Sequence, residues 1–236
     1  MEEPIILYED NQIIVAVKPQ NVPTQGDSSG DVSLLDQIKN YVKVKYNKPG
    51  NAFIGLVHRL DRPTGGVMVF ARNSKSAERL CAQMENGTFE KKYLAVTVGT
   101  PLDRRAKLIN WLVKNEETNT VRVALARTEN AKQAELDYHV LEEADRIALL
   151  DVTLGTGRSH QIRVQLQNIG NPVFGDAKYG GDTLAKVHNL ALWAYSLSFA
   201  HPVTKKTMVF KVFPPLEKTP WKYFNVEKYI NTVKPE

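Results

Sequence analysis

The chain has 236 residues, of which 42% are hydrophobic and 24% charged, so it is long enough to bury its own core. Its one cysteine, Cys81, excludes a disulfide framework and clustered cysteine ligands, its acidic N-terminus with Pro4 is atypical of a signal peptide, and no apolar run is long enough to span a membrane. The net charge of +5 is consistent with a polyanionic partner, and we expect a cytoplasmic protein.

Short apolar and alternating segments bounded by turn residues predict a series of strands. In chain order these segments are residues 4–10, 11–19, 67–71, 88–99, 121–125, 134–143, 146–157, 190–202 and 205–215. The first two are expected to meet at a turn at Asp10 and Asn11, and the last two at Thr204 and Lys205. The whole stretch from Pro101 to Glu143 has a β pattern.

Four segments predict helices, at residues 34–46, 74–86, 159–170 and 221–230. Ser33 is positioned to cap the first helix, which the segment NKPGN at 47–51 should end, and Gly87 should follow the second. For the third helix we expect Ser159 as the N-cap and Gly170 as the stop.

Strands outnumber helices and occur in hairpin-like groups, which favours the α+β class with a largely antiparallel sheet and flanking helices. The sequence contains no internal repeat, low-complexity tract or long linker. We therefore expect a single catalytic domain over residues 1–236, with a central cleft.

Several kinds of site are disfavoured by the motifs. The loop LGTGRSH opens a helix, but His160 stands where a dinucleotide-binding motif requires glycine, and no phosphate-binding P-loop is present. The five histidines are scattered, and there is no G-x-S-x-G nucleophile motif. We expect neither a metal nor a nucleotide cofactor.

Charged residues interrupt apolar segments at two places. In HRLDRPTGG, Asp61 stands between Arg59 and Arg62, and the apolar AFIGLV and VMVFA lie on either side. In SHQIRVQL, His160 and Arg163 are three residues apart and share a helix face. Each group could be solvated, but its apolar neighbours favour a position at a cleft, where an arginine close to Asp61 would keep the carboxylate ionised.

Lys91, Lys92 and Tyr93 form a third group of interest. Tyr93 could be a core aromatic residue of a strand, or it could stack on a nucleic-acid base while the adjacent lysines contact phosphates.

Together these segments resemble the RluA-type pseudouridine synthases. HRLDRPTGGVMVFA resembles the catalytic motif of that family, although Gly65 stands where serine is usual. Further segments that resemble family motifs occur in family order and are EKKYLAVTVG, GRSHQIRVQL (with Ser159 where threonine is usual), NPVFGDAKYG and LWAYSLSFAHPVTKK. The resemblance covers most of the chain, without the N-terminal S4-type RNA-binding domain that many relatives carry.

The resemblance implies that the protein isomerises uridine to pseudouridine in ribosomal or transfer RNA, without a cofactor and as a monomer. Asp61 would be the essential carboxylate, acting on C1′ as a nucleophile or on the C2′ proton. Arg163, rather than Arg158, would hold Asp61, and Tyr93 would pack against the target base. Residues expected to contact the RNA substrate are His58, Arg59, Arg62, Lys92, Arg158 and His160.

Two other functions share some of these features. A non-catalytic RNA-binding protein with the same fold would not need Asp61. An N-glycosidase would also use a carboxylate at C1′, but it would release free uracil.

Overall fold

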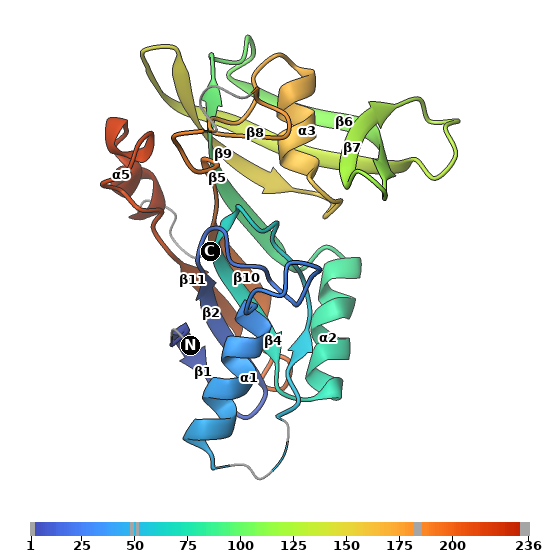
Figure 1. The fold of residues 1–236 in the computed structure, drawn as a ribbon, viewed down its shortest axis with the longest axis vertical. Helices are drawn as coiled ribbons and strands as arrows, with labels where there is room; N and C mark the ends of the chain where they lie inside the picture. Colours follow the sequence, from blue (N-terminus) through green and yellow to red (C-terminus); the bar gives the residue numbers. More distant parts are fainter. Residues whose placement is uncertain (1–2, 48–49, 51, 182–185, 232–236) are drawn as a thin grey trace. The chain divides into compact units, whose positions relative to one another are not determined.

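The computed structural model describes residues 3–47, 50, 52–181 and 186–231. The chain forms two compact units: unit 1 comprises Met1–Lys91 and Ala194–Val212, and unit 2 comprises Lys92–Trp193 and Phe213–Glu236. Figure 1 shows the course of the chain through their helices and strands.

Unit 1 is built on a sheet in the order β1-β2-β4-β10, with β3 paired to β4 and β11 paired to β10. Its strands are β1 (Ile5–Glu9), β2 (Ile13–Lys18), β3 (Gly55–Leu56), β4 (Gly65–Ala71), most of β10 (Leu192–Ala200) and β11 (Thr207–Lys211). The β2–β4 register is antiparallel and pairs Lys18 with Gly66. The end of β2 therefore lies beside the start of β4, directly after the Asp61 segment.

Two helices of unit 1 begin at side-chain caps. Helix α1 (Leu34–Lys45) starts at Ser33, which forms the expected cap, and Asp36 completes a capping box. Residues 48, 49 and 51, in the segment expected to end this helix, lie outside the described ranges. Helix α2 (Ser74–Glu85) begins at the Asn73 cap, and Gly87 follows it with φ +77°.

Unit 2 is built on a sheet in the order β5-β9-β8-β6-β7, in which every neighbouring pair is antiparallel. These strands are β5 (Glu90–Val98, which begins in unit 1), β6 (Arg105–Asn115), β7 (Thr120–Ala124), β8 (Lys132–Ala144) and β9 (Ile147–Leu154). Strand β6 falls within the predicted β stretch but was not predicted as a separate element. Leu112, Val121 and Ala134 of this sheet form a buried cluster with Val164.

The helices of unit 2 differ from the prediction in two places. Helix α3 (Gln161–Asn168) starts after His160, not Ser159, and His160 has left-handed backbone angles and no side-chain cap bond. The Gln161 side chain accounts for this start, because its Oε1 accepts the Arg158 N–H and the Thr156 hydroxyl and closes the preceding loop. In the described part of the C-terminal region, η1 (Trp221–Tyr223) and α5 (Val226–Asn231) replace the single helix expected at 221–230.

The predicted α+β class and the largely antiparallel sheet are confirmed. The single domain and the central cleft remain predictions.

Candidate active site

The segment that contains Asp61 connects β3 to β4 without regular secondary structure. The Thr64 N–H donates to the Asp61 carbonyl at 2.9 Å, which closes a tight turn. Asp61 is half-buried, whereas Arg59 is exposed. The partly shielded carboxylate of Asp61 therefore begins the turn, and the guanidinium of Arg59 lies at the surface two residues before it.

Gly66 allows the turn to enter the sheet. Its φ is +131°, and a Cβ atom at this position would lie 2.2 Å from the Ala194 carbonyl oxygen. No larger residue fits between β4 and β10 at this point without a backbone shift. The close approach fixes where the Asp61 segment ends.

Lys18 is a fully buried amine next to the same segment. Its Nζ donates to the carbonyls of Pro19 at 3.0 Å, Val22 at 2.6 Å and Arg62 at 2.9 Å. Burial lowers the pKa of Lys18 to about 7, although the nearby Asp61 carboxylate favours the charged form. Lys18 thus ties the residue after Asp61 to the 19–22 loop and lies within electrostatic reach of the carboxylate.

Arg62 has partners in a loop of unit 1. Its guanidinium donates to the Ser29 hydroxyl at 2.9 Å and to the Asn21 carbonyl at 3.1 Å, and it forms an ion pair with Asp31. Asp27 lies at 3.7 Å. These contacts order the 21–31 loop. Arg62 is exposed, and its contact with RNA remains a prediction.

His58 lies against the second half of β4. Its Nε2 accepts the Val69 N–H at 3.1 Å, and its ring packs edge-on to Phe89 with centroids 5.6 Å apart. Burial, together with the positive charge of Lys91, lowers the pKa of His58 to about 3. Its ring is therefore neutral at physiological pH, so its predicted contact with RNA would not be an ion pair.

Two of the predicted site residues of unit 2 are adjacent on β5. Tyr93 is buried and pairs in register with Val152, and half-buried Lys92 pairs with Thr153. Successive strand residues point to opposite faces of the sheet, so the two side chains cannot act on the same face.

Arg163 is buried on α3 and binds the carboxylate of Asp176. Its Nε lies 2.7 Å from Asp176 Oδ2 and its Nη2 lies 2.7 Å from Asp176 Oδ1, which is a bidentate contact. The Tyr179 ring covers the guanidinium, with 5.0 Å from its carbon to the ring centroid. Arg163 is therefore held in one orientation by two residues of the 171–180 segment.

The two other predicted residues of this region lie before α3. His160 Nδ1 is 2.7 Å from the Tyr179 hydroxyl, so the ring is oriented by the residue that covers Arg163. Arg158 is exposed, and its Nε donates to the Gln133 carbonyl at 3.1 Å.

The structure thus groups the predicted residues by unit. Unit 1 contains His58, Arg59, Asp61 and Arg62, and unit 2 contains Lys92, Tyr93, Arg158, His160 and Arg163. An ion pair between Asp61 and Arg163 remains a prediction.

Sequence reasoning missed three residues of these surroundings. Lys18 has a visible signal, since it is a charged residue that ends the apolar run IIVAV immediately before Pro19. Asp176 and Tyr179 lie in NPVFGDAKYG, a segment that contributed to the resemblance but to which no role was assigned.

Two absences concern the described residues alone. No three His, Cys, Asp or Glu side chains there are grouped so that they could hold a metal ion. None of the helices in these ranges combines the length and apolar character that a transmembrane helix requires.

A comparison with protein families decides the assignment. The family model described as RNA pseudouridylate synthase matches residues 12–168, a span that includes Asp61, Tyr93 and Arg163. The chain belongs to this family. Membership confirms the resemblance drawn from the motifs and the prediction of an RNA pseudouridine synthase, an isomerase.

Individual relatives agree with this assignment. The chain is 33% identical to ribosomal large subunit pseudouridine synthase C of Buchnera aphidicola, over 97% of this chain and 70% of the relative. It is 31% identical to the protein of the same name in Vibrio cholerae, over 91% and 66%. An uncharacterized RNA pseudouridine synthase of Mycoplasma pneumoniae is 36% identical over 91% and 67%. The chain thus spans about two thirds of the length of these relatives.

Solved structures of pseudouridylate synthases share the fold. Human RNA pseudouridylate synthase domain containing 4 aligns with a TM-score of 0.75 and 24% identity, over 89% of this chain and 88% of that chain. Human RNA pseudouridylate synthase domain containing 1 aligns with a TM-score of 0.73 and the same identity, over 91% and 85%. These similarities confirm the fold class.

Proposed function

We propose that this pseudouridine synthase modifies uridine in the RNA of the large ribosomal subunit and that Asp61 is its essential carboxylate. The proposal rests on the family match across the Asp61 segment. The ribosomal substrate is supported by the names of relatives that align with nearly the whole chain. A ribosomal RNA substrate also favours the expected cytoplasmic location, and a monomer remains our expectation.

The reaction breaks the N1–C1′ bond of uridine, turns the base and forms a C5–C1′ bond. C5 loses a proton and N1 gains one, so no electrons are transferred and no group leaves. Asp61 either attacks C1′ and forms a transient ester, or removes the C2′ proton to give a glycal. Both routes need an ionised, fixed carboxylate, and the Lys18 contacts with the adjacent Arg62 carbonyl and the Asp61 turn support this role.

Arg163 would hold Asp61 ionised through an ion pair. Asp176 accepts hydrogen bonds from Nε and Nη2 of Arg163 and so fixes the orientation of the guanidinium. Tyr93 would pack against the base and assist the loss of the C5 proton, which is consistent with its buried position at the start of the unit 2 sheet.

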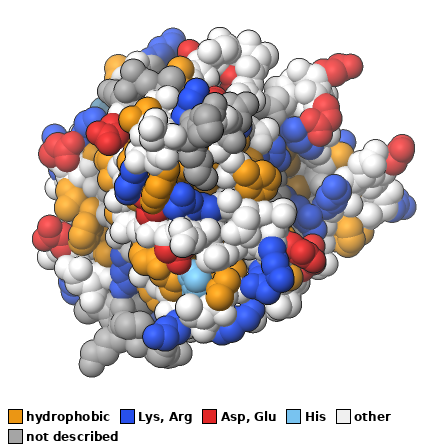
Figure 2. Space-filling model, turned by 90° about the horizontal axis from the view of Figure 1, so that it is seen from below, with side chains coloured by type: hydrophobic (Ala, Val, Ile, Leu, Met, Phe, Trp, Pro, Cys, Tyr) orange, Lys and Arg blue, Asp and Glu red, His pale blue; other side chains and the backbone are white. Residues whose placement is uncertain are grey.

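Access to the target requires that the uridine leave its helix, at a cost of a few kcal/mol. Exposed Arg59, two residues from Asp61, would fill the space that the base leaves or contact the displaced strand. The other RNA contacts would come from His58, Arg62, Lys92, Arg158 and His160. On the face in Figure 2, basic and acidic side chains are interspersed, so the net charge of +5 does not by itself identify the RNA-binding surface.

Tritium release from [5-³H]uridine-labelled RNA tests the proposal. Ribosomal RNA from cells that lack this protein would be incubated with wild type and with Asp61→Asn. We expect release by wild type and a reduction of about 10⁴-fold or more in the variant, because the nucleophile or base is lost. Equal release by both proteins would refute the role of Asp61.

Product analysis separates the other two functions. Free uracil in the wild-type reaction would identify an N-glycosidase. Tight RNA binding without release from ribosomal or transfer RNA would favour a non-catalytic RNA-binding protein. Release from transfer RNA alone would refute the ribosomal substrate but not the synthase.

A further inference from the structure

Asp176 is a buried carboxylate whose partners are all fixed. Its side chain is 0% exposed, and that of Arg163 is 6% exposed. Beyond its two contacts with the guanidinium, Asp176 Oδ1 accepts the main-chain N–H of Lys178 at 2.9 Å and of Tyr179 at 3.1 Å. The carboxylate is therefore oriented by its own backbone before it meets the arginine.

The loop around Asp176 is built to keep that orientation. Gly175 has φ +73°, and a Cβ atom there would lie 2.3 Å from the Asn189 carbonyl oxygen. The Gly180 N–H donates to the Asp176 carbonyl at 2.8 Å, which closes the loop. Neither Asp176 nor its backbone can shift without disrupting these contacts.

Tyr179 restrains the guanidinium from a second direction. Its ring lies over Arg163, and its hydroxyl accepts the Val121 N–H of β7 at 2.8 Å. His160 Nδ1 contacts the same hydroxyl. Asp176 binds the guanidinium in its plane and Tyr179 covers its face, so the two residues together hold it in one orientation.

We propose that Asp176 is a positioning residue that fixes the orientation of the Arg163 guanidinium. The proposal rests on the proposed function, in which Arg163 holds Asp61. An ion pair buried to this degree contributes little net stability, since the cost of desolvating both charges offsets their attraction. A fixed orientation is what the bidentate geometry provides, and catalysis needs such an orientation.

Asp176→Asn tests the proposal, because asparagine can keep the contacts with the loop backbone but loses the bidentate contact with Arg163. Its Oδ1 can still accept the N–H groups of Lys178 and Tyr179, which leaves its NH₂ group facing the Nε–H of Arg163, donor against donor. We expect kcat to fall by about 10- to 100-fold, the KM for RNA to change less than about threefold, and the acid limb of the kcat–pH profile to move to higher pH.

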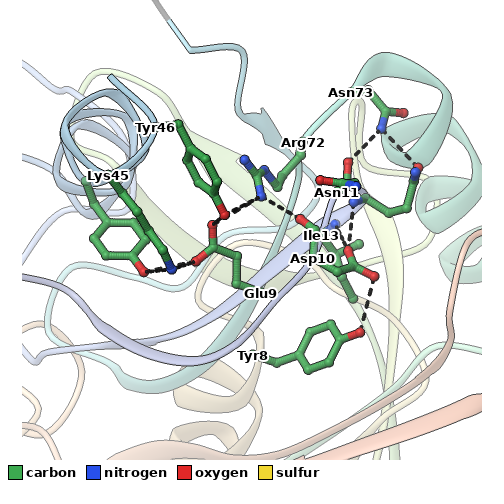
Figure 3. Close-up of polar contacts among 11 residues, drawn as sticks. Tyr8, Glu9, Asp10, Asn11, Ile13, Lys45, Tyr46, Arg72 and Asn73 are labelled. Carbon is green, nitrogen blue, oxygen red and sulfur yellow. Dashed lines mark hydrogen bonds and ion pairs between the residues drawn. The ribbon is translucent and has the colours of Figure 1, made fainter. Parts of the chain in front are cut away.

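Glu9→Gln is the matched control. Glu9 is a shielded carboxylate of unit 1 that accepts hydrogen bonds from Tyr41, Lys45, Tyr46 and Arg72, as the polar contacts in Figure 3 show in part. Its replacement should lower the melting temperature and leave kcat and the acid limb unchanged. A merely structural role for Asp176 would give the same result as this control and would overturn the proposal.

Arg163→Lys tests the role of Asp176 if the Asp176→Asn variant does not fold. Lysine keeps the positive charge but cannot form the bidentate contact with Asp176. We expect a similar loss of kcat, whereas full activity of this variant would overturn the proposal. Tritium release by wild type is measured in the same series, so failure of the proposed function is recognised separately.

Discussion

At the scale of single residues, the two arginines beside Asp61 have different surroundings. Arg62 donates to the 21–31 loop, which folds back over the Asp61 turn, and the Asn21 N–H returns a bond to the Arg62 carbonyl at 2.8 Å. Arg59 is exposed on the other side of Asp61 in the sequence. One arginine therefore organises the site, and the other is positioned to meet the substrate.

Arg59→Ala should weaken RNA binding several-fold and reduce the slope of log K against log salt concentration by about one, because one phosphate contact is lost. Fluorescence anisotropy at several salt concentrations measures both quantities. Arg62→Ala is the comparison. If its slope also falls by about one, Arg62 contacts RNA as we expect from the sequence, whereas an unchanged slope with faster proteolysis of the 21–31 loop would restrict it to the loop.

Lys18→Met should lower the free energy of unfolding by about 2–4 kcal/mol, because three buried carbonyls lose their donor. The pKa of Lys18 in the folded protein, about 7, lies below its ordinary value of 10.5. The unfolded chain binds more protons between these values, so the stability of wild type relative to the variant should rise from pH 7 to 10. Urea denaturation across this range checks both expectations, and a variant as stable as wild type at pH 9 would contradict them.

At the scale of elements, one cluster ties α1 to the sheet of unit 1. Tyr41 and Lys45 of α1 and the following Tyr46 converge on Glu9 at the end of β1, and Arg72, directly after β4, joins them. Figure 3 shows Lys45, Tyr46 and Arg72 around the Glu9 carboxylate. The helix is thus held at its N-terminus by the Ser33 cap and at its C-terminus by this cluster.

Glu9→Gln should make unfolding less sensitive to acid. Burial raises the pKa of Glu9, but the hydrogen bonds from Lys45, Tyr46 and Tyr41 outweigh it and hold this pKa below its ordinary value of 4.5. The resulting stability is present above pH 4.5 and is lost as the pH falls through the lower folded value. Unfolding by urea between pH 3 and 7 measures the effect, and identical pH dependence in wild type and variant would exclude it.

Elements with strong periodicity were predicted well from the sequence. The β1–β2 hairpin, helices α1 and α2 and the β10–β11 pair occur where the pattern of apolar residues predicts them. Strand β3 has only two residues and leaves no pattern, and the start of α3 depends on a side-chain contact of Gln161 that no local motif reveals.

At the scale of the whole molecule, the division into two units could not be predicted from the sequence. Two of the three boundaries, after Lys91 and after Trp193, fall within β5 and β10, and the third, after Val212, comes one residue after the end of β11. A strand that continues through a boundary lacks the flexible glycine- and proline-rich linker by which a boundary is usually recognised. The motifs of the site were visible because they are local, whereas the Lys18–Arg62 contact joins residues 44 apart in the sequence and the Arg163–Asp176 contact joins residues 13 apart.

The buried amine of Lys18 also makes the Asp61 segment accessible to chemical probing. The Lys18 side chain has no exposed surface, so an acylating reagent can reach its amine only when the segment opens. Its rate of modification therefore reports how often the segment opens. RNA that closes over the segment would slow this labelling, so a single lysine can serve as an intrinsic sensor of substrate engagement.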